Sequence, residues 1–276
     1  TLGEVAQGWS LYSRGCWIQQ GRAEVTSVLR GMGFKGDRLD KIIMACVMNY
    51  WKIVHKPFQP EYPGHREWNR NAAQLSLKPE EGEHPTWDKV LDHVGAGLDE
   101  SLCGTEFSSG AEYLLAWAAC LVRKPYTPLP YLFLYGPQNS GKSMFHEALY
   151  LLFKGGVGYV RADHALRSAS SFNAELSNAV LCVVEETNLS HSKGAYDRVK
   201  DWVTSKQISI HPKGKTPYEI QNTTHWIQCA NDINYVKAFP GDTRITYLKV
   251  NPPLHLHAPT LQATRPRREN GDSSYR

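Results

Sequence analysis

The chain has 276 residues, of which 41% are hydrophobic and 21% charged, a composition typical of a globular protein with a substantial core. Its formal net charge of +4 is too small to indicate nucleic-acid binding by itself. The six cysteines form no C-x-x-C pair, so neither a zinc site nor a disulfide framework is indicated, and a reducing, cytoplasmic compartment fits best. No apolar run has the length of a membrane span. Because the chain begins at Thr1 and not at a methionine, we expect a fragment of a longer protein.

The first part of the chain carries helical periodicity. Residues 1–56 predict a small helical region of two or three short helices, punctuated by glycines. Residues 57–85 are rich in proline and charge, which predicts a linker or a surface arm. Two helices should follow, one starting at Thr86 as its cap and ending near residue 94, and a more apolar, buried one over 112–122.

From residue 131 onward, apolar strands alternate with helices. Strands are expected at 131–135, 179–184, 225–230 and 245–250, and helices at 144–153 and 196–204. The alternating segments 208–210 and 218–220 flank a turn of proline, glycine and lysine, which predicts a β-hairpin. This order is typical of a three-layer α/β fold with a central, largely parallel sheet. Residues 253–276 are polar and should form a disordered tail.

The segment between the first strand and its helix matches G-x-x-x-x-G-K-S/T, the pattern of a phosphate-binding loop. It consists of Gly136, Pro137, Gln138, Asn139, Ser140, Gly141, Lys142 and Ser143. Backbone N–H groups of such a loop cradle phosphate oxygens together with the helix that follows. Lys142 would neutralise the β- and γ-phosphates, and the Ser143 hydroxyl would hold Mg²⁺. A tight turn that happens to contain glycines is the alternative, but the flanking strand and helix favour binding of ATP and Mg²⁺.

Two acidic residues follow the apolar strand at 179–184. A buried strand that delivers Glu185 and Glu186 at its carboxyl end suits a Mg²⁺-ATP site beside a phosphate loop. We expect Glu185 to serve the metal ion and Glu186 to polarise the attacking water. The alternative is that the two glutamates only mark the point where a strand reaches solvent.

Two more polar residues stand at strand ends. Asn231 follows the strand at 225–230 and would contact the γ-phosphate or the attacking water; otherwise it is an ordinary turn residue. Arg244 precedes the last strand and would reach the ATP of a neighbouring subunit, or it would pair with Asp242 on the surface. The residues alone leave both alternatives open.

The predicted hairpin has a basic tip. It carries His211, Lys213 and Lys215, whose charges would contact phosphodiesters without reading sequence. A charged tip also protects an exposed hairpin from edge pairing, and this segment by itself favours that simpler reading.

Together these motifs resemble the motor domain of superfamily 3 helicases, ring-forming ATPases of the AAA+ type that small DNA viruses, phages and plasmids encode. The phosphate loop, the paired acids, the hairpin lysines and Asn231 follow one another in the family's order within residues 86–252. The hairpin is similar to that of papillomavirus and parvovirus replicative helicases, with Lys213 at the channel lysine. Gly214 stands where the family has a histidine, so the role of that histidine would be either reduced or taken by His211. The approach to the phosphate loop is similar to phage and satellite primase-helicases.

The resemblance implies an ATP-dependent DNA helicase that translocates on single-stranded or forked DNA during replication of a phage, virus or mobile element. It implies a homo-hexameric ring in the host cytoplasm, with no membrane association. Lys200 and Arg244, the latter as an arginine finger, would complete the ATP site of the next subunit. A primase module would lie upstream on a longer parent chain, since residues 1–56 contain none of its identifiable catalytic acids.

Two other classes share the phosphate loop. A P-loop kinase would need an arginine-bearing lid and a site for its second substrate. A non-translocating ATPase switch or loader would hydrolyse ATP without unwinding DNA.

Overall fold

The computed structural model of the chain describes residues 9–102, 105–167, 172–190, 194–214, 216–236 and 242–253. Lys215 and nearly all of the tail expected at 253–276 lie outside these residues. In the described part of the chain, no helix combines the length and the apolar character needed to cross a membrane.

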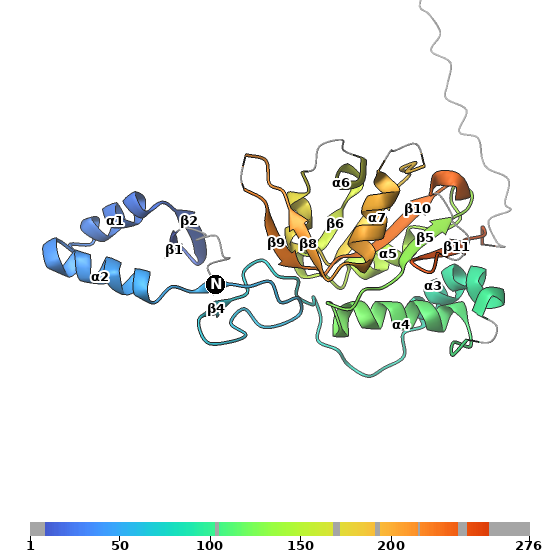
Figure 1. Ribbon diagram of the computed structural model, residues 1–276. Coiled ribbons are helices and arrows are strands. Elements are labelled where there is room, and N and C mark those ends of the chain that lie inside the picture. Colours follow the sequence, from blue (N-terminus) through green and yellow to red (C-terminus); the bar gives the residue numbers. More distant parts are fainter. Residues whose placement is uncertain are drawn as a thin grey trace, which may run out of the picture.

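A five-stranded parallel sheet forms the centre of the structure (Figure 1). Its strands, in order across the sheet, are β11 (Ile245–Lys249), β5 (Tyr131–Tyr135), β10 (His225–Ala230), β7 (Leu181–Glu185) and β6 (Tyr159–Arg161). Every neighbouring pair is parallel, and Ile227 in the middle strand stands beside both Leu132 and Val183. The expected α/β fold with a parallel central sheet is therefore confirmed, although the short edge strand β6 was not predicted.

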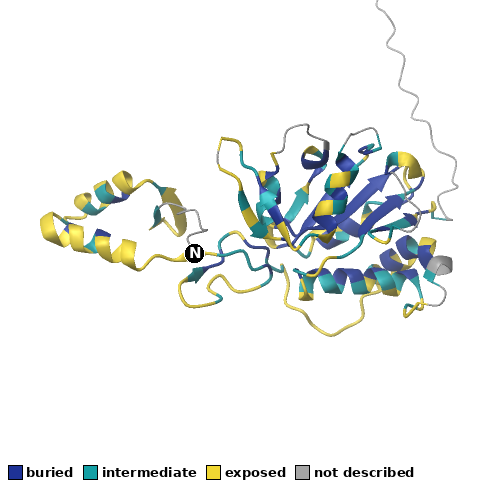
Figure 2. Ribbon diagram, in the orientation of Figure 1, coloured by how far each residue is buried: buried dark blue, intermediate teal, exposed yellow. Residues whose placement is uncertain are grey.

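Helices cover both faces of this sheet. They are α3 (Pro85–Gly95), α4 (Gly110–Arg123) and α5 (Met144–Tyr150) on one face, and α6 (Asp163–Arg167) and α7 (Ala195–Thr204) on the other. Successive side chains of a strand point to opposite faces, so Leu132 and Leu134 pack on the first layer and Tyr131 and Phe133 on the second. Figure 1 shows α3 and α4 below the sheet and α6 and α7 above it, and Figure 2 shows the strands as the most buried part.

The starts of two helices follow from their first residues. α3 begins at Pro85, which occupies the first helical turn, so Thr86 lies inside the helix and its predicted role as the cap is wrong. Proline is favoured there because its missing N–H has no partner to lose. α4 begins after Ser109, whose hydroxyl accepts a hydrogen bond from the Glu112 N–H at 3.2 Å. α5 ends at Tyr150 and is shorter than predicted.

An antiparallel pair of strands follows α7. β8 (Gln207–Ile210) and β9 (Tyr218–Gln221) place Ile208 opposite Ile220. The Asn222 side-chain amide ties the base of this pair to the end of α7, donating to the Trp202 carbonyl oxygen at 2.7 Å and the Ser205 carbonyl oxygen at 2.8 Å. Short 3-10 helices complete the sheet domain: η1 (Ala96–Leu102), η2 (Lys154–Gly156), η3 (Ala174–Asn178) and η4 (Ile233–Tyr235).

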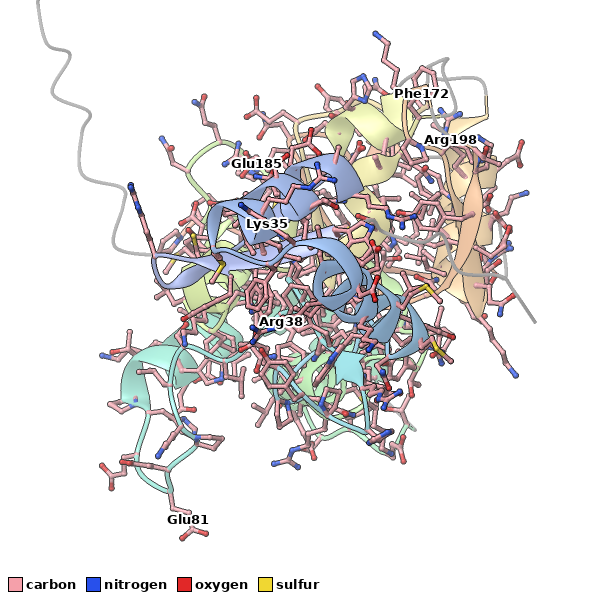
Figure 3. The ribbon with its side chains drawn as sticks, turned by 90° about the vertical axis from the view of Figure 1, so that its left-hand side faces the viewer. Lys35, Arg38, Glu81, Phe172, Glu185 and Arg198 are labelled. Atoms are coloured by element: carbon pink, nitrogen blue, oxygen red, sulfur yellow. The ribbon has the colours of Figure 1, made fainter. Side chains whose placement is uncertain are left out.

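Residues 9–48 form an N-terminal module that projects away from the sheet (Figure 1). It contains the hairpin β1 (Trp9–Ser13) and β2 (Cys16–Gln20), then α1 (Arg22–Gly31) and α2 (Gly36–Met48). The hairpin turns at Arg14 and Gly15, whose φ angles of 51° and 81° are both positive, as in a type I′ turn. The expectation of helices alone is therefore wrong for residues 9–20. Figure 3 looks onto the free end of the module, with Lys35 and Arg38 labelled.

The segment from residue 49 to 84, here called the arm, connects the module to α3. β3 (Lys52–Ile53) and β4 (Glu67–Trp68) pair in parallel, and the Lys56 ammonium forms an ion pair with Glu67 at 2.6 Å. The Tyr126 hydroxyl of the sheet domain donates to the His55 carbonyl oxygen at 3.1 Å. The arm is thus attached to the sheet domain and has structure of its own.

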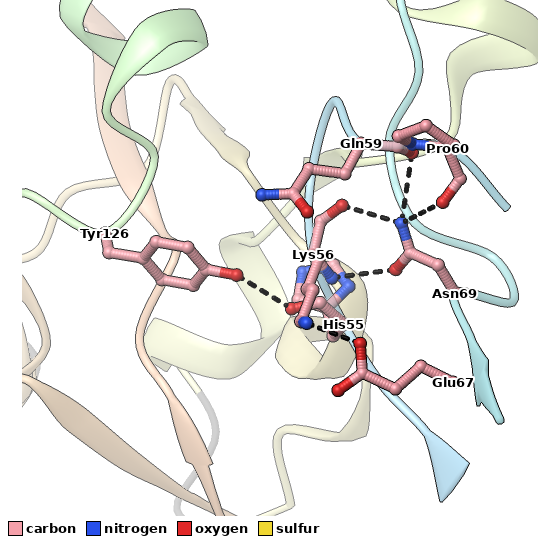
Figure 4. Close-up of polar contacts among 7 residues, drawn as sticks. All are labelled: His55, Lys56, Gln59, Pro60, Glu67, Asn69 and Tyr126. Atoms are coloured by element: carbon pink, nitrogen blue, oxygen red, sulfur yellow. Dashed lines mark hydrogen bonds and ion pairs between the residues drawn. The ribbon is translucent and has the colours of Figure 1, made fainter. Parts of the chain in front are cut away.

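One buried amide organises the arm (Figure 4). Asn69 is only 3% exposed, and its side-chain oxygen accepts the Lys56 N–H at 2.8 Å. Its side-chain N–H groups donate to three carbonyl oxygens, those of Lys56, Gln59 and Pro60, at 2.7, 3.1 and 3.2 Å. Because a buried amide without partners is costly, this network holds the loop of the arm in one conformation.

Candidate nucleotide site and hairpin

The carboxyl ends of three neighbouring strands bring the predicted residues to one edge of the sheet. β5 runs into the phosphate-loop segment, β10 ends before Asn231, and β7 ends in the paired acids. Because β10 lies between β5 and β7, the three ends are joined: the Gly136 N–H donates to the Ala230 carbonyl oxygen at 3.3 Å, and the Glu186 N–H to the Cys229 carbonyl oxygen at 2.9 Å. Ligands of open parallel sheets bind at this edge.

The phosphate-loop segment, residues 136–143, is held from two sides. His93 of α3 hydrogen-bonds through Nε2 with the Ser140 carbonyl oxygen at 2.7 Å, and Ser140 itself is fully buried. On the other side, a Cβ atom at Gly136 would come within 2.1 Å of the Val250 carbonyl oxygen. Only glycine fits such a close approach of two backbones. The loop backbone is therefore positioned by α3 and by the segment that follows β11.

Lys142 folds over the loop that carries it. Its ammonium donates to the carbonyl oxygens of Gly136 at 2.9 Å and Pro137 at 2.7 Å. Burial lowers the pKa of Lys142, and the nearby Glu186 carboxylate opposes that lowering. Lys142 and the acid predicted to polarise water are thus within electrostatic reach of each other.

Two residues of this edge adopt left-handed backbone conformations. Asn139 has φ of 62° and Glu186 has φ of 50°. Asparagine tolerates this region, whereas glutamate rarely adopts it. Such conformations cost free energy and cluster at functional sites. At Glu186 the left-handed turn ends β7 and leaves the side chain exposed.

Glu185 is surrounded by groups that the sequence did not reveal. Its carboxylate pairs with the Arg161 guanidinium of β6 at 2.8 Å and lies 3.5 Å from Nε2 of His146. His146, on α5, is fully buried and contacts the Tyr159 hydroxyl through Nδ1 at 3.0 Å. Burial lowers the pKa of His146 to about 4, so its ring is neutral at physiological pH. Glu185 is thus held at its predicted position, with Arg161 as its charge partner.

A second carboxylate steadies the end of β7. Asp163, the first residue of α6, accepts the Glu185 N–H at 3.2 Å and the Thr187 hydroxyl. These bonds tie the backbone on either side of Glu186 to α6. The strained residue is therefore bracketed by hydrogen-bonded neighbours.

Ser143 and Asn231 complete the edge. Ser143 immediately precedes α5, and Asn231 is an exposed residue directly after β10. Among the residues that the structure describes, no group of three His, Cys, Asp or Glu is arranged to hold a metal ion. Mg²⁺ that arrives with nucleotide phosphates needs only one or two protein carboxylates.

Arg244 and Lys200 belong to one polar cluster. The Arg244 guanidinium contacts both carboxylate oxygens of Asp242, at 2.7 and 3.1 Å, and the Tyr196 hydroxyl donates to the same carboxylate. The Lys200 ammonium lies 4.8 Å from the centre of the Tyr196 ring and pairs with Asp197 at 2.9 Å. The hydrogen bonds from Arg244 lower the pKa of Asp242 to about 2, and burial raises that of Tyr196 to about 12.

This cluster lies away from the phosphate loop of its own chain. The Arg244 carbonyl oxygen accepts the Tyr131 N–H at 2.8 Å, which places Arg244 at the start of β5. The loop begins at the opposite end of this five-residue strand. At about 3.3 Å per residue, the two backbones are about 16 Å apart. The pairing with Asp242, foreseen as one alternative, is present.

The residues predicted to contact DNA lie at the turn between β8 and β9. Asn173, which is buried, accepts the His211 N–H at 2.8 Å and donates to the Ser209 carbonyl oxygen at 2.9 Å, so η3 holds the base of the turn. Lys213 is exposed, and Gly214 has φ of 72°. In Figure 1 the turn stands clear of the helices around it. Lys215 lies outside the described residues.

The supporting residues differ in how far the sequence could have revealed them. His146 follows Lys142 by four positions and lies on α5, the helix that begins directly after the phosphate-loop segment. Arg161 belongs to a strand of three residues, too short for a clear period. Tyr196 and Asp242 are 46 positions apart, and only folding brings them together.

Comparisons with known proteins agree with this architecture. The profile of a family of unknown function (DUF5906) matches residues 134–244, from β5 to Arg244. Among solved structures, two of the NrS-1 C-terminal region, the A form apo structure and the apo structure of residues 305–718, each match with a TM-score of 0.60 and 16% identity. Each alignment covers 88% of this chain but 56% of the other, so the chain spans little more than half of their length. At this identity the likeness establishes a shared fold. No curated protein matches the sequence.

The Asp242 cluster predicts a specific pH dependence of stability. An Asp whose pKa is about 2 instead of 3.8 stabilises the fold above the higher value and loses that contribution as pH falls through the lower one. Asp242→Asn should therefore lower the free energy of unfolding by about 1–2 kcal/mol between pH 5 and 7, and by less as pH falls from 4 toward 2. Denaturant unfolding across this range measures the difference.

Asp197→Asn is the matched control, because this carboxylate is 76% exposed and its pair with Lys200 should contribute little. A difference between wild type and Asp242→Asn that is equal at pH 3 and pH 7 would show that the charge of Asp242 contributes nothing.

Proposed function

We propose that this chain is the motor domain of an ATP-driven DNA helicase, of the superfamily 3 and AAA+ type, that acts in replication of a phage, virus or mobile element. The observation that carries the proposal is the meeting of β5, β7 and β10 at one sheet edge. There the phosphate loop, the paired acids and Asn231 follow three adjacent strands. The fold shared with the NrS-1 C-terminal region supports it.

In this proposal, residues 136–143 bind the triphosphate of ATP. The Lys142 ammonium, now bonded to loop carbonyl oxygens, would exchange them for the β- and γ-phosphates, which are stronger partners for a cation. The Ser143 hydroxyl and Glu185 would hold Mg²⁺, whose charge offsets that of the phosphates. Arg161 and His146 keep the Glu185 carboxylate at this edge.

Glu186 would polarise the attacking water, and Asn231 would position it against the γ-phosphate. Glu186 has a left-handed backbone, whereas Glu185 belongs to β7, and in this proposal the two acids serve different ligands. The electrostatic coupling between Glu186 and Lys142 supports a place for this carboxylate near the phosphates.

A neighbouring subunit would complete the site. Lys200 and Arg244 are linked through Tyr196 and Asp242, so both can act from a single surface. Arg244 lies beside the first residue of β5, and the phosphate loop follows the last residue of that strand. Arg244 would therefore contact the ATP of another copy of the chain. A heterologous contact of this kind closes into a ring, which we propose to be a hexamer.

The hairpin of β8 and β9 would carry DNA through that ring. Lys213 and Lys215, with His211 below them, would contact the phosphodiester backbone of one strand in the channel. Asn173 and Asn222 connect the hairpin to η3 and α7, and the chain continues from η3 into β7 and from Asn222 into β10, the strands that precede Glu186 and Asn231. Movement of β7 and β10 on hydrolysis would reach the hairpin through these connections.

The first prediction from this proposal concerns the nucleotide. Lys142→Ala should abolish ATP binding, whereas Glu186→Gln should bind ATP but hydrolyse it at least about 100-fold more slowly, because only the polarising group is lost. Nucleotide-binding and phosphate-release assays separate the two effects. Lys154→Ala, an exposed lysine after α5, is the control and should behave as wild type.

The second prediction concerns the subunit interface. Lys142→Ala and Arg244→Ala should each be inactive in ATP hydrolysis, but an equal mixture should recover activity at about a quarter of its interfaces, where the intact halves of the two variants meet. Replacing the Arg244→Ala partner by the Lys142→Ala/Arg244→Ala double variant should recover none. If mixing restores nothing in a protein that assembles, Arg244 does not act in trans.

The third prediction separates a helicase from a kinase or a non-translocating switch. Lys213→Ala should hydrolyse ATP in the absence of DNA yet fail to displace a strand from forked DNA, and its DNA affinity should lose about one unit of salt slope. Lys206→Ala, an exposed lysine at the base of the same hairpin, is the control. Undiminished unwinding by Lys213→Ala would refute the role of the hairpin.

A further inference from the structure

The positive charge of the chain is concentrated in its first quarter. Residues 1–71 contain ten lysine and arginine residues against six aspartate and glutamate residues. The remaining 205 residues contain 21 of each sign, so residues 1–71 carry the whole net charge of +4. The helicase function proposed above uses none of these residues.

Aromatic rings from the module and the arm form a continuous ladder in this basic region. Trp17 of β2 lies at its centre, 5.3 Å from Tyr12 and 5.1 Å from Trp68 between ring centres. The Trp17 indole also hydrogen-bonds to the Tyr62 hydroxyl, and Tyr62 lies 5.5 Å from Trp51. Rings from the N-terminal hairpin and from three positions of the arm thus meet.

Most of this ladder faces solvent. Tyr12 is 60% exposed, Trp51 51%, Tyr62 49% and Trp17 40%, while Trp68 is buried beneath them. Exposed large hydrophobic side chains are normal when single, but a contiguous group marks an interaction surface. Figure 2 shows how little of the module is buried.

A cavity of about 330 Å³ opens beside the ladder. Trp17 and Trp68 form its aromatic walls, with Gly15, Arg70 and Asn71 among its other lining residues. The Arg70 guanidinium stacks over the Trp68 ring at 5.1 Å. The volume is at the lower end of the range for ligand pockets and has room for a nucleobase.

The cavity wall is preformed. The Trp68 indole N–H donates to Glu61 at 3.0 Å, and the buried Asn69 beside it holds the loop of the arm through its amide bonds. Glu61, which lines the cavity, accepts that bond, and Glu67, which does not line it, pairs with Lys56. The cavity therefore offers a ligand two aromatic rings and the Arg70 guanidinium, beside the hydrogen-bonded Glu61 carboxylate.

Two non-glycine residues with positive φ angles lie at this cavity. Six non-glycine residues in the described part of the chain have positive φ angles, and two of them, Asn139 and Glu186, belong to the nucleotide site. The other four are in the module and the arm: Arg14, Phe58, Arg66 and Asn71. Arg14 adjoins Gly15 at the rim of the cavity, and Asn71 lines it. Strain of this kind persists where a function requires it.

We propose that Trp17, Trp68, Arg70 and the neighbouring exposed rings form a second nucleic-acid site, which binds single-stranded DNA by stacking of its bases. Exposed aromatic rings interleaved with arginine are the surface that unpaired bases and their phosphates require. A duplex offers no free base faces and is excluded. The identification of the ligand as DNA rests on the proposed helicase function. The proposal that bases stack on these rings does not depend on that function.

The segment that carries the proposed site is connected to the base of the hairpin. Nε2 of His55 in the arm contacts the Thr223 hydroxyl at 3.2 Å, and Thr223 lies between β9 and β10. The arm thus joins the sheet domain at the base of the proposed DNA-contacting hairpin.

The test measures binding of a fluorescent oligo-dT by anisotropy, without nucleotide and in a Lys213→Ala background that removes the hairpin contact. Trp17→Ala and Arg70→Ala should each weaken binding roughly tenfold, and Trp17→Phe should retain most of the affinity because it keeps a ring. An abasic oligonucleotide of equal length should bind weakly. It should bind the Lys213→Ala protein and its Trp17→Ala derivative with equal affinity. Failure of the helicase proposal leaves this binding intact, since no hydrolysis or hairpin contact is involved.

Two control substitutions lie in the N-terminal module but outside the group of aromatic rings. Met48→Ala removes an apolar side chain that is 72% exposed, and Lys35→Ala removes an exposed charge; both should change affinity less than about twofold. Circular dichroism melting verifies that each variant is folded. Unchanged oligo-dT affinity in folded Trp17→Ala and Arg70→Ala would overturn the proposal and leave the surface to a protein partner. Equal affinity for abasic and oligo-dT strands would overturn it as well.

Discussion

The parallel pairing of β10 between β5 and β7 is the constraint on which the candidate site depends. It places the ends of three strands side by side, so that a loop, two acids and an amide that are up to 95 positions apart reach one edge. Both faces of the sheet are buried under helices, and a change of register by one residue would turn core side chains toward the wrong layer. The packing of the strands therefore fixes the positions of the polar residues that follow the strand ends.

The polar groups around this edge keep it in one arrangement. His93 and the backbone after β11 hold the phosphate loop, Arg161 and His146 hold Glu185, and Asp163 fixes the backbone around the left-handed Glu186. The second cluster, around Asp242, is at the opposite end of β5. In the ring proposed above, each interface would join a nucleotide site of one subunit to the Asp242 cluster of the next.

Prediction from sequence succeeded where a local pattern is long and periodic. The bounds of β5 and β10 agree with the expected segments because most of their side chains are apolar, as is typical of buried parallel strands. It failed where the determinant is short or distant. Residues 9–20 form a hairpin whose signal is a two-residue turn with Arg14 in a conformation that arginine seldom adopts. Thr86 looks like a cap, but Pro85 before it already occupies the first turn. For residues 57–85 the sequence left a linker and a surface arm as alternatives, because the single buried amide that organises the arm, Asn69, gives no local pattern.

The sequence by itself determined the phosphate-loop motif, the order of the strands along the chain and the residues that follow them, since all of these depend on neighbours within a few positions. It could not determine which strands lie side by side, which cation pairs with Glu185, or that Trp17 meets Trp68 from a different segment. Those facts were decided only by the tertiary structure. Burial of apolar surface selects the packing of whole elements, and polar or aromatic partners far apart in the chain then meet as a consequence.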